Sequence, residues 1–182
     1  MTCCHPERRR LGFIVYAEGN GCDGILRAVV DGLRRGPARL GGVVQHNQDV
    51  AHRRHCTMTL EDLYGGGHIQ ISEFRGNGAR GCRLDRSALA TASARIHAAI
   101  EAGVDLIVIN KFGKTEAEGN GLIAEIAEAA ARGIAVLIAV PERNLDAWRE
   151  FAADLAIELP ADPDALLRWC LAMAGQRSLE TA

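Results

Sequence analysis

An amide and two ammonium groups come close together in the segment Asn110–Lys114, NKFGK. The segment follows a short, β-branched apolar run, Asp105–Asn110, of the kind that forms a strand buried on both faces of a parallel sheet. Open α/β sheets bind their ligands beyond the carboxyl ends of the strands. We therefore expect Asn110, Lys111 and Lys114 to contact a small anionic ligand.

A second candidate anion site is the glycine-rich turn EGNGCDG, which begins at Glu18. It separates an apolar run, Leu11–Tyr16, from a segment with apolar residues at helical spacing, Gly24–Arg35. The backbone N–H groups of such a turn and the N-terminus of the following helix together form a cradle for phosphate. The candidate binding residues of this turn are Gly19, Asn20, Gly21, Cys22, Asp23 and Gly24.

The turn departs from a full phosphate loop, which ends in Gly-Lys-Ser/Thr so that the Lys reaches the terminal phosphates and the hydroxyl reaches Mg²⁺. The matching positions here are Gly21, Cys22 and Asp23, so the ammonium is absent and a carboxylate replaces the hydroxyl. Two interpretations of the turn stay open: a retained anion site, or an ordinary strand–helix turn in which Asp23 is the N-cap of the helix.

A further glycine-rich loop, Arg75–Asp85, carries three arginines. Because guanidinium groups bind oxyanions in a fork geometry, Arg80 and Arg83 are candidate anion contacts, although a solvated loop explains them equally well. His46, His52, His55 and Cys56 are potential metal ligands near one another in the sequence. Their spacing matches no zinc motif, and we expect a polar loop there.

The remaining pattern supplies the elements that position these residues. We expect strands at Leu11–Tyr16, Leu40–Gln45, Asp105–Asn110, Ile134–Val140 and Asp154–Glu158. We expect a hairpin at the sheet edge from Thr57–Tyr64 and His68–Phe74 around a triple glycine. Helices are expected at Gly24–Arg35, Arg86–Ala102 with Asp85 as cap, Glu116–Arg132, Asn144–Ala153 and Asp162–Ala174, and Gly103 and Gly133 each end a helix.

Alternation of strands and helices predicts an α/β fold: a three-layer sandwich with a mostly parallel sheet and an edge β-hairpin. With 182 residues, the chain fits one domain. We place this domain at residues 11–175, between a disordered N-terminal tail at residues 1–10 and a C-terminal tail at residues 176–182.

Composition narrows the function further. A net charge of −2 and an isoelectric point near 6.3 argue against a general nucleic-acid binder. No apolar run approaches the roughly 18 residues of a membrane span, and the polar, basic start is no secretory signal. We therefore expect a cytoplasmic protein whose six scattered cysteines are free thiols, structural rather than catalytic.

Several phrases together carry a resemblance to a known family: VYAEGNGCDGIL, GGVVQHN, LEDL, GARGCRLD, DLIVINKFGKTEAEGNGL and AVPERNLDAWREF. They cover most of Leu11–Trp169, and NKFGKTEAEG is the most specific. The chain resembles a bacterial family of unknown function that is related to P-loop nucleoside-triphosphatases and often encoded beside molybdate-transport genes. The resemblance implies a P-loop-NTPase-like sandwich.

In active P-loop nucleoside-triphosphatases the later strand ends in an acid that helps hold Mg²⁺, often followed by a Glu that positions water. Asn110 and Lys111 stand in these places here. Hydrolysis of this kind depends on the loop Lys and the metal. The resemblance therefore implies nucleotide binding with weak or absent hydrolysis, and nucleoside-triphosphatase-like chemistry if the protein is an enzyme. Glu116 is the candidate metal ligand if Mg²⁺ accompanies the nucleotide.

Two other functions are compatible with the same residues. A tetrahedral oxyanion such as molybdate or tungstate needs the same amides, Lys and Arg as a phosphate, so the protein is alternatively an oxyanion-binding protein that needs no nucleotide. The missing catalytic groups also fit a regulatory or scaffold protein without catalysis. A homo-oligomer is left open.

Overall fold

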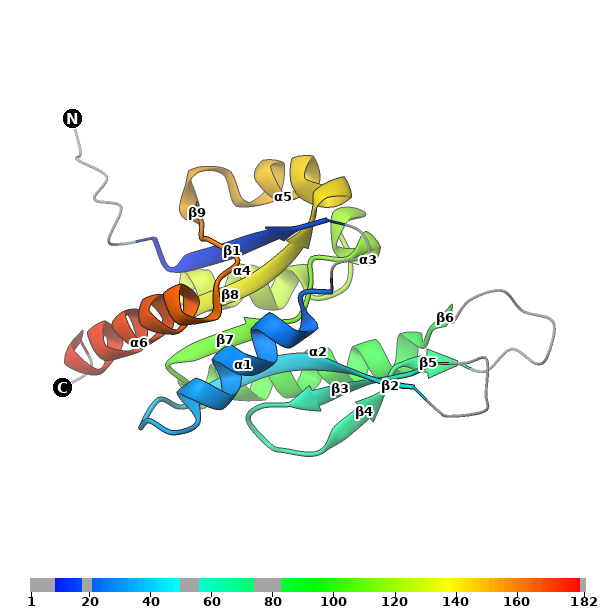
Figure 1. The fold of residues 1–182 in the computed structure, drawn as a ribbon, viewed down its shortest axis with the longest axis horizontal. Coiled ribbons are helices and arrows are strands. Elements are labelled where there is room, and N and C mark those ends of the chain that lie inside the picture. The colour runs from blue at the N-terminus through cyan, green and yellow to red at the C-terminus, as the bar shows by residue number, and fades with distance from the viewer. Residues whose placement is uncertain (1–8, 18–20, 50–55, 74–82, 181–182) are drawn as a thin grey trace.

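The apolar segments of the chain form a seven-stranded sheet with helices on both faces (Figure 1). The structure is a computed structural model and describes residues 9–17, 21–49, 56–73 and 83–180. The strands are β1 (Leu11–Tyr16), β2 (Leu40–Asp49), β3 (Cys56–Asp62), β4 (His68–Gln70), β5 (Ser72–Glu73), β6 (Arg83–Leu84), β7 (Leu106–Ile109), β8 (Ala135–Pro141) and β9 (Ala156–Glu158).

The helices are α1 (Asp23–Leu33), α2 (Arg86–Glu101), α3 (Lys114–Ala117), α4 (Ile123–Ala131), α5 (Leu145–Ala152) and α6 (Pro163–Glu180), with short 3-10 turns η2 (Glu142–Asn144) and η3 (Ala153–Leu155). The strand order in the large sheet is β4-β3-β2-β7-β8-β1-β9. The five strands from β2 to β9 pair in parallel, while β3 and β4 are antiparallel to their neighbours. A second, two-stranded sheet joins β5 and β6.

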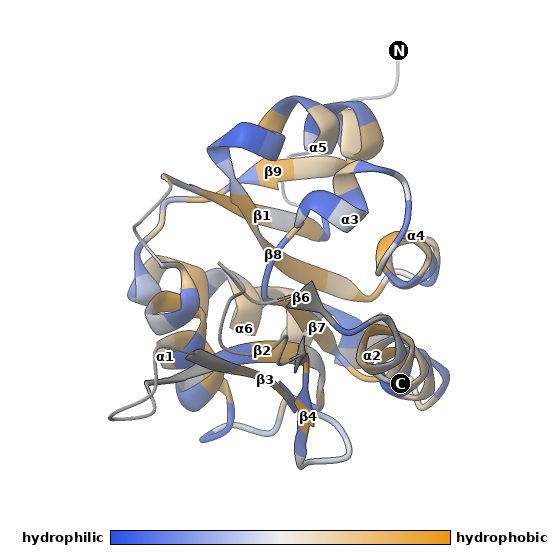
Figure 2. Ribbon diagram, turned by 90° about the vertical axis from the view of Figure 1, so that its right-hand side faces the viewer, coloured by the Kyte–Doolittle hydropathy of each residue, from blue (hydrophilic) through white to orange (hydrophobic). Residues whose placement is uncertain are grey.

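Two apolar cores lie on the two faces of the sheet, because alternate strand residues point to opposite sides. On one face, α1 and α6 cover a core that includes Leu26, Leu137 and Leu166. On the other face, α2, α4 and α5 cover a core that includes Ile96 and Trp148. Viewed along the sheet, α1 and the pair α2 and α4 lie on opposite sides of the strands (Figure 2). The predicted three-layer α/β sandwich of the P-loop-NTPase type is confirmed.

Most predicted elements appear near their expected positions. The hairpin of β3 and β4 lies at the sheet edge, with Leu60 opposite Ile69. Asp85 is the N-cap of α2, and its side chain accepts a hydrogen bond from the backbone N–H of Ser87. Gly103 and Gly133 follow α2 and α4 with positive φ of 69° and 65°, as expected for glycines that end helices.

One predicted helix is wrong. The segment Glu116–Arg132 is not a single helix but two, because α3 ends at Ala117 and α4 begins at Ile123. Gly119 and Gly121 interrupt it with φ of 78° and 65°, a left-handed backbone that no α-helix contains. The apolar spacing of this segment is helical, but the two glycines override it.

Three boundaries differ from expectation. Strand β2 continues past Gln45 to Asp49 and so pairs with the full length of β3. Helix α6 runs to Glu180, through part of the stretch expected to be a C-terminal tail. At the other end, the expected tail covers residues 1–10. Residues 1–8 lie outside the described residues, but Arg10 donates to the carbonyl of Gly133.

Within the described ranges, no helix is both long enough and apolar enough to cross a membrane. Cys22 and Cys170 are free and buried. The expectation of free thiols therefore holds for these two cysteines.

Candidate functional site

The carboxyl ends of the neighbouring strands β1 and β8 mark the place where an open α/β sheet is expected to bind its ligand. From β1 the chain passes through α1, on one face, to β2. From β8 it passes through α5, on the other face, to β9. The connections thus leave the neighbouring strands β1 and β8 in opposite directions. Such a switch point is where doubly wound sheets bind ligands.

The glycine-rich turn meets the end of β7 at Asn110. The Asn110 Nδ2 donates to Oδ1 of Asp23 at 3.1 Å, and the Cys22 Sγ donates to the Asn110 carbonyl at 3.6 Å. Asp23 is the first residue of α1, whereas Cys22 is the N-cap and makes no side-chain cap bond. The interpretation of Asp23 as N-cap is therefore wrong, because its side chain turns to the neighbouring strand end.

Asn110 brings an unused acceptor to this junction. Its side chain is buried, with an exposed fraction of 3%. Its Oδ1 has no hydrogen-bond partner among the described residues. A buried amide oxygen without a partner costs free energy, so this atom suits a ligand donor or a bound water.

Lys111 extends from a loop whose backbone is fixed on both sides. The next residue, Phe112, donates its N–H to the Ala139 carbonyl at 2.8 Å and accepts from the Asn144 Nδ2 at 2.9 Å. The Phe112 ring is buried against Trp148, with ring centres 5.2 Å apart. Lys111 itself is exposed. The fold therefore presents an exposed ammonium group from a backbone that two neighbouring hydrogen bonds hold in place.

Lys114 is placed less favourably. Its side chain is 85% exposed and its Nζ lies 3.6 Å from the Glu118 carboxylate, one helical turn along. The two lysines are the only ones in the chain, and the structure places both at the carboxyl end of β7. Lys111 is the nearer to the glycine-rich turn, since its positive charge acts on Cys22.

Burial keeps the Cys22 thiol and the Tyr16 phenol protonated at neutral pH. The pKa of the Cys22 thiol rises to about 11, because of burial first and the Asp23 carboxylate second, with the Lys111 charge opposing the rise. The pKa of Tyr16, at the end of β1, is also raised by burial and by Cys22. Cys22 is thus a thiol at neutral pH rather than a nucleophilic thiolate, as expected for a structural cysteine.

Arg143 is a residue of this site that sequence reasoning missed. It lies in η2, directly after β8, and its charge opposes the rise in the pKa of Tyr16. The signal was present in the sequence, because Glu142-Arg143-Asn144 follows the buried strand β8 as Asn110-Lys111 follows β7. Cationic side chains therefore follow two neighbouring strands at the switch point.

Glu116 has both carboxylate oxygens engaged. Its Oε2 accepts from the backbone N–H of Gly113 at 2.9 Å, and its Oε1 accepts from that of Leu122 at 3.1 Å. The side chain is buried, with an exposed fraction of 7%. These bonds assign Glu116 a role in holding the loop, and its role as a metal ligand stays a prediction.

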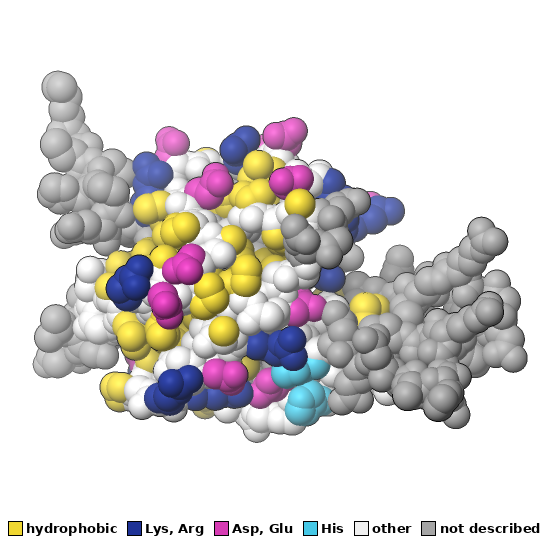
Figure 3. All heavy atoms as spheres, in the orientation of Figure 1, with side chains coloured by type: hydrophobic (Ala, Val, Ile, Leu, Met, Phe, Trp, Pro, Cys, Tyr) yellow, Lys and Arg dark blue, Asp and Glu magenta, His cyan; other side chains and the backbone are white. Residues whose placement is uncertain are grey.

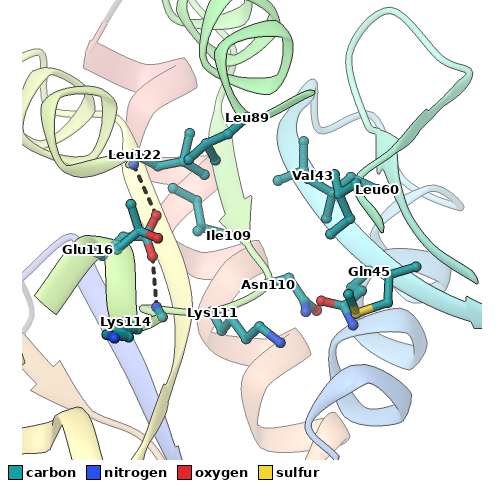
Figure 4. A pocket seen from close by; sticks show the side chains of 14 residues that line it. Val43, Gln45, Leu60, Leu89, Ile109, Asn110, Lys111, Lys114, Glu116 and Leu122 are labelled. Carbon is teal, nitrogen blue, oxygen red and sulfur yellow. Dashed lines mark hydrogen bonds between the residues drawn. The ribbon is translucent and has the colours of Figure 1, made fainter. Parts of the chain in front are cut away.

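An apolar pocket opens beside Asn110 on the face covered by α2 and α4 (Figure 4). Its volume is about 340 Å³, within the range of small-molecule sites. The side chains of Asn110 and Gln45 lie next to each other at its polar end, while Glu116 lies at the far side (Figure 4). The apolar walls come from Val43, Met58, Leu60, Ile71, Leu89, Ile109 and Leu122. Sequence reasoning missed this pocket, whose walls come from distant segments.

The remaining predicted contacts are not placed. Gly19, Asn20 and Arg80 lie outside the described residues, as do His52 and His55. Arg83 belongs to β6, but its side chain is not described. Gly21 and Gly24 are described and exposed, and a Cβ added at either would meet no atom within 4 Å. The described part of the turn thus borders open space.

Comparison with known proteins places the chain in a family. The family described as "Protein of unknown function (DUF2478)" matches residues 11–169. The described strands and helices from β1 to β9 fall within this match, as does the first part of α6, up to Trp169. The family thus takes in the glycine-rich turn, the end of β7 and the pocket.

A curated relative is the molybdenum import ATP-binding protein ModC 2 of Bradyrhizobium diazoefficiens. It is 39% identical to this chain over 163 residues, a match that covers 90% of this chain. The same match covers 18% of the relative, so this chain spans less than a fifth of that protein's length. The relative's name describes the longer protein.

Proposed function

This chain belongs to the DUF2478 family, and from the geometry at the end of β7 we propose that it is a P-loop-like nucleotide-binding protein with weak or absent hydrolysis. The observation that carries the proposal is the position of Asn110. Its side chain joins the N-terminus of α1 through Asp23 and keeps a buried, unpartnered Oδ1 at the border of the pocket.

Groups for an anion come from three neighbouring strand ends. The first turn of α1 supplies backbone N–H groups and the positive end of the helix dipole. Lys111 follows β7 and Arg143 follows β8, so each adds a positive charge near the switch point. Lys114 stays part of the proposal with a smaller share, because Glu118 already pairs with it. Gly19, Asn20, Arg80 and Arg83 remain expected contacts.

The pocket favours a nucleotide over a bare oxyanion. A tetrahedral oxyanion needs only the charged groups, whereas a nucleotide also has a base that gains from apolar contact. A volume of about 340 Å³ with mainly apolar walls next to Asn110 supplies that contact. The name of the curated relative, which includes ATP binding, supports the same choice.

Weak hydrolysis follows from the residues at the two strand ends. The ammonium of a phosphate loop is missing, and Asn110 stands in place of the metal-holding acid. Because hydrolysis depends on those charges, we expect turnover far below that of active nucleoside-triphosphatases. If Mg²⁺ enters with the nucleotide, Asp23 offers a carboxylate within the described part of the turn, and Glu116 is the candidate predicted from the sequence.

Calorimetry and thermal unfolding with ATP, ADP and GTP, each with and without Mg²⁺, test the proposal. We expect a nucleotide to raise the melting temperature and release heat. Lys111→Ala and Arg143→Ala should each weaken binding about tenfold, the equivalent of about 1.4 kcal/mol. Arg149→Ala, which removes an exposed arginine on α5, is the matched control and should bind as the unaltered chain does.

The alternatives are arms of the same experiment. Binding of molybdate or tungstate with no response to nucleotides would replace the proposal with the oxyanion-binding protein, a reading that the relative's link to molybdenum import favours. No heat and no shift with any of these ligands at millimolar concentration would leave the regulatory or scaffold protein.

A further inference from the structure

Three metal-ligating side chains from three strands meet on the sheet face that carries α1. Glu61 of β3 lies opposite Val44 of β2 and opposite His68 of β4. His46 is two residues beyond Val44, so it points to the same face and lies diagonally from Glu61. Val44 belongs to the core under α1. Neighbouring strands therefore bring together residues that are distant in the sequence.

The geometry of this cluster, His46, Glu61 and His68, is that of a partly formed metal site. One ligand atom from each residue lies within 4.8 Å of the other two. The His46 Nε2 is 2.7 Å from the Glu61 Oε2. The two imidazole rings are edge to face, with centres 5.6 Å apart and planes at 70°.

The three side chains are only partly buried, which leaves room for water as a further ligand of a bound ion. The side chains of His46 and Glu61 have exposed fractions of 26% and 19%, and His68 is exposed. In the space-filling view, histidine side chains lie at the surface among acidic and basic groups, over the region of β3 and β4 (Figure 3). Ions can therefore enter from solvent without any movement of the backbone.

Arg34, at the end of α1, donates to the second oxygen of Glu61 at 2.5 Å. This contact orients the carboxylate and leaves Oε2 facing His46. The guanidinium also repels a cation, which reduces the affinity of the site.

We propose that His46, Glu61 and His68 bind a divalent transition-metal ion of the Zn²⁺ type, with water completing the coordination. Two imidazoles and one carboxylate are ligands that Zn²⁺ and Co²⁺ accept. Tetrahedral ligands on Zn²⁺ are about 3.3 Å apart, from bond lengths of about 2.0–2.1 Å. The present separations, from 2.7 Å between His46 and Glu61 up to no more than 4.8 Å, span that value.

This cluster differs from the group of potential metal ligands that the sequence pattern indicated. That pattern grouped His46 with His52, His55 and Cys56 along the chain. The structure instead joins His46 to Glu61 and His68 across the sheet. It is also separate from the proposed nucleotide site, since none of its three residues borders the apolar pocket.

Titration of the metal-free chain with Zn²⁺ and Co²⁺ tests the proposal, with no nucleotide present. We expect one ion per chain at this site, a rise in melting temperature, and a Co²⁺ visible spectrum without the charge-transfer band of thiolate ligands. His46→Ala, Glu61→Gln and His68→Ala should each weaken binding at least tenfold. Metal-free melting and circular dichroism of each variant separate loss of ligand from loss of fold.

His97→Ala is the matched control. His97 also pairs with a carboxylate, that of Glu128, at 3.1 Å, but it is not part of the three-ligand cluster. We expect His97→Ala to bind Zn²⁺ as the unaltered chain does. The proposal is overturned if the double variant His46→Ala, His68→Ala keeps the affinity and stoichiometry of the unaltered chain, or if the Co²⁺ spectrum shows thiolate ligands.

Discussion

The Glu116 carboxylate closes the loop between α3 and α4 by accepting two backbone N–H groups, those of Gly113 and Leu122. A buried N–H without a partner costs about 1–3 kcal/mol, and hydrogen bonds to charged groups are among the stronger ones. Gly113 follows Lys111 by two residues. The same carboxylate thus shapes the loop that presents the site's lysine.

Replacing Glu116 should cost stability. We expect Glu116→Ala to lower the free energy of unfolding by about 3 kcal/mol, because the buried N–H of Leu122 and the half-buried N–H of Gly113 lose their acceptor. Glu116→Gln keeps one acceptor and should lower it by about 2 kcal/mol. Urea unfolding measures both, with the exposed Glu118→Gln as control, expected to change by less than about 0.5 kcal/mol. An intact stability with weakened Mg²⁺ binding would instead assign Glu116 to a metal.

The sequence pattern predicts most of the strands and helices correctly, and it fails at one helix. The parallel strands, the edge hairpin and the Asp85 cap follow from apolar runs, glycines and a capping residue, which act locally. The break at Gly119 and Gly121 is also local, but helical spacing on both sides conceals it. The Glu116 carboxylate then holds the broken segment by accepting the N–H of Leu122, a contact that apolar spacing does not reveal.

The two glycines of this break should differ in their tolerance of alanine. Both have positive φ, which costs a residue with a Cβ about 1 kcal/mol. A Cβ at Gly119 meets no atom within 4 Å, whereas one at Gly121 would collide with the Glu116 carboxylate. We therefore expect Gly119→Ala to lower the free energy of unfolding by about 1 kcal/mol. Gly121→Ala should lower it by about 1–3 kcal/mol more than that. Equal losses in urea unfolding would contradict this assignment.

The candidate nucleotide site and the metal cluster could be predicted only in part, because they depend on contacts between distant segments. Asn110 and Lys111 are found from their place after a buried strand, since strand ends of a parallel sheet share one edge. The pocket and the cluster of His46, Glu61 and His68 depend on strand register, which brings separate segments together. The sequence alone does not give the strand register, so it contains no local signal for the pocket or for the cluster.

The whole molecule buries several groups that lose a proton only in alkali. Burial raises the pKa of Tyr16, raises that of Cys22 to about 11 and raises that of Cys170 to about 12. Unfolded cysteines lose the proton near 9.0. Above that pH the unfolded chain binds fewer protons than the folded chain, so the free energy of unfolding falls as pH rises.

The contribution of these buried groups to the free energy of unfolding should therefore be constant below pH 9 and fall above it. The thiol contributions are fully present below 9.0 and are lost as pH rises through about 11 for Cys22 and about 12 for Cys170. Each thiol adds at most about 1.4 kcal/mol per pH unit in its window. Urea midpoints from pH 7 to 11 measure the slope, and Cys170→Ala should make it shallower. A slope unchanged by that substitution would count against the expectation.

Both outer strands of the large sheet are short, since β4 spans His68–Gln70 and β9 spans Ala156–Glu158. A long, flat outer strand offers unpaired backbone groups to another chain and invites fibril growth, and short outer strands limit this. Two copies of this chain would form few hydrogen bonds by pairing their sheets edge to edge. We therefore expect the described domain to resist β-aggregation, and any homo-oligomer to associate through helices or loops.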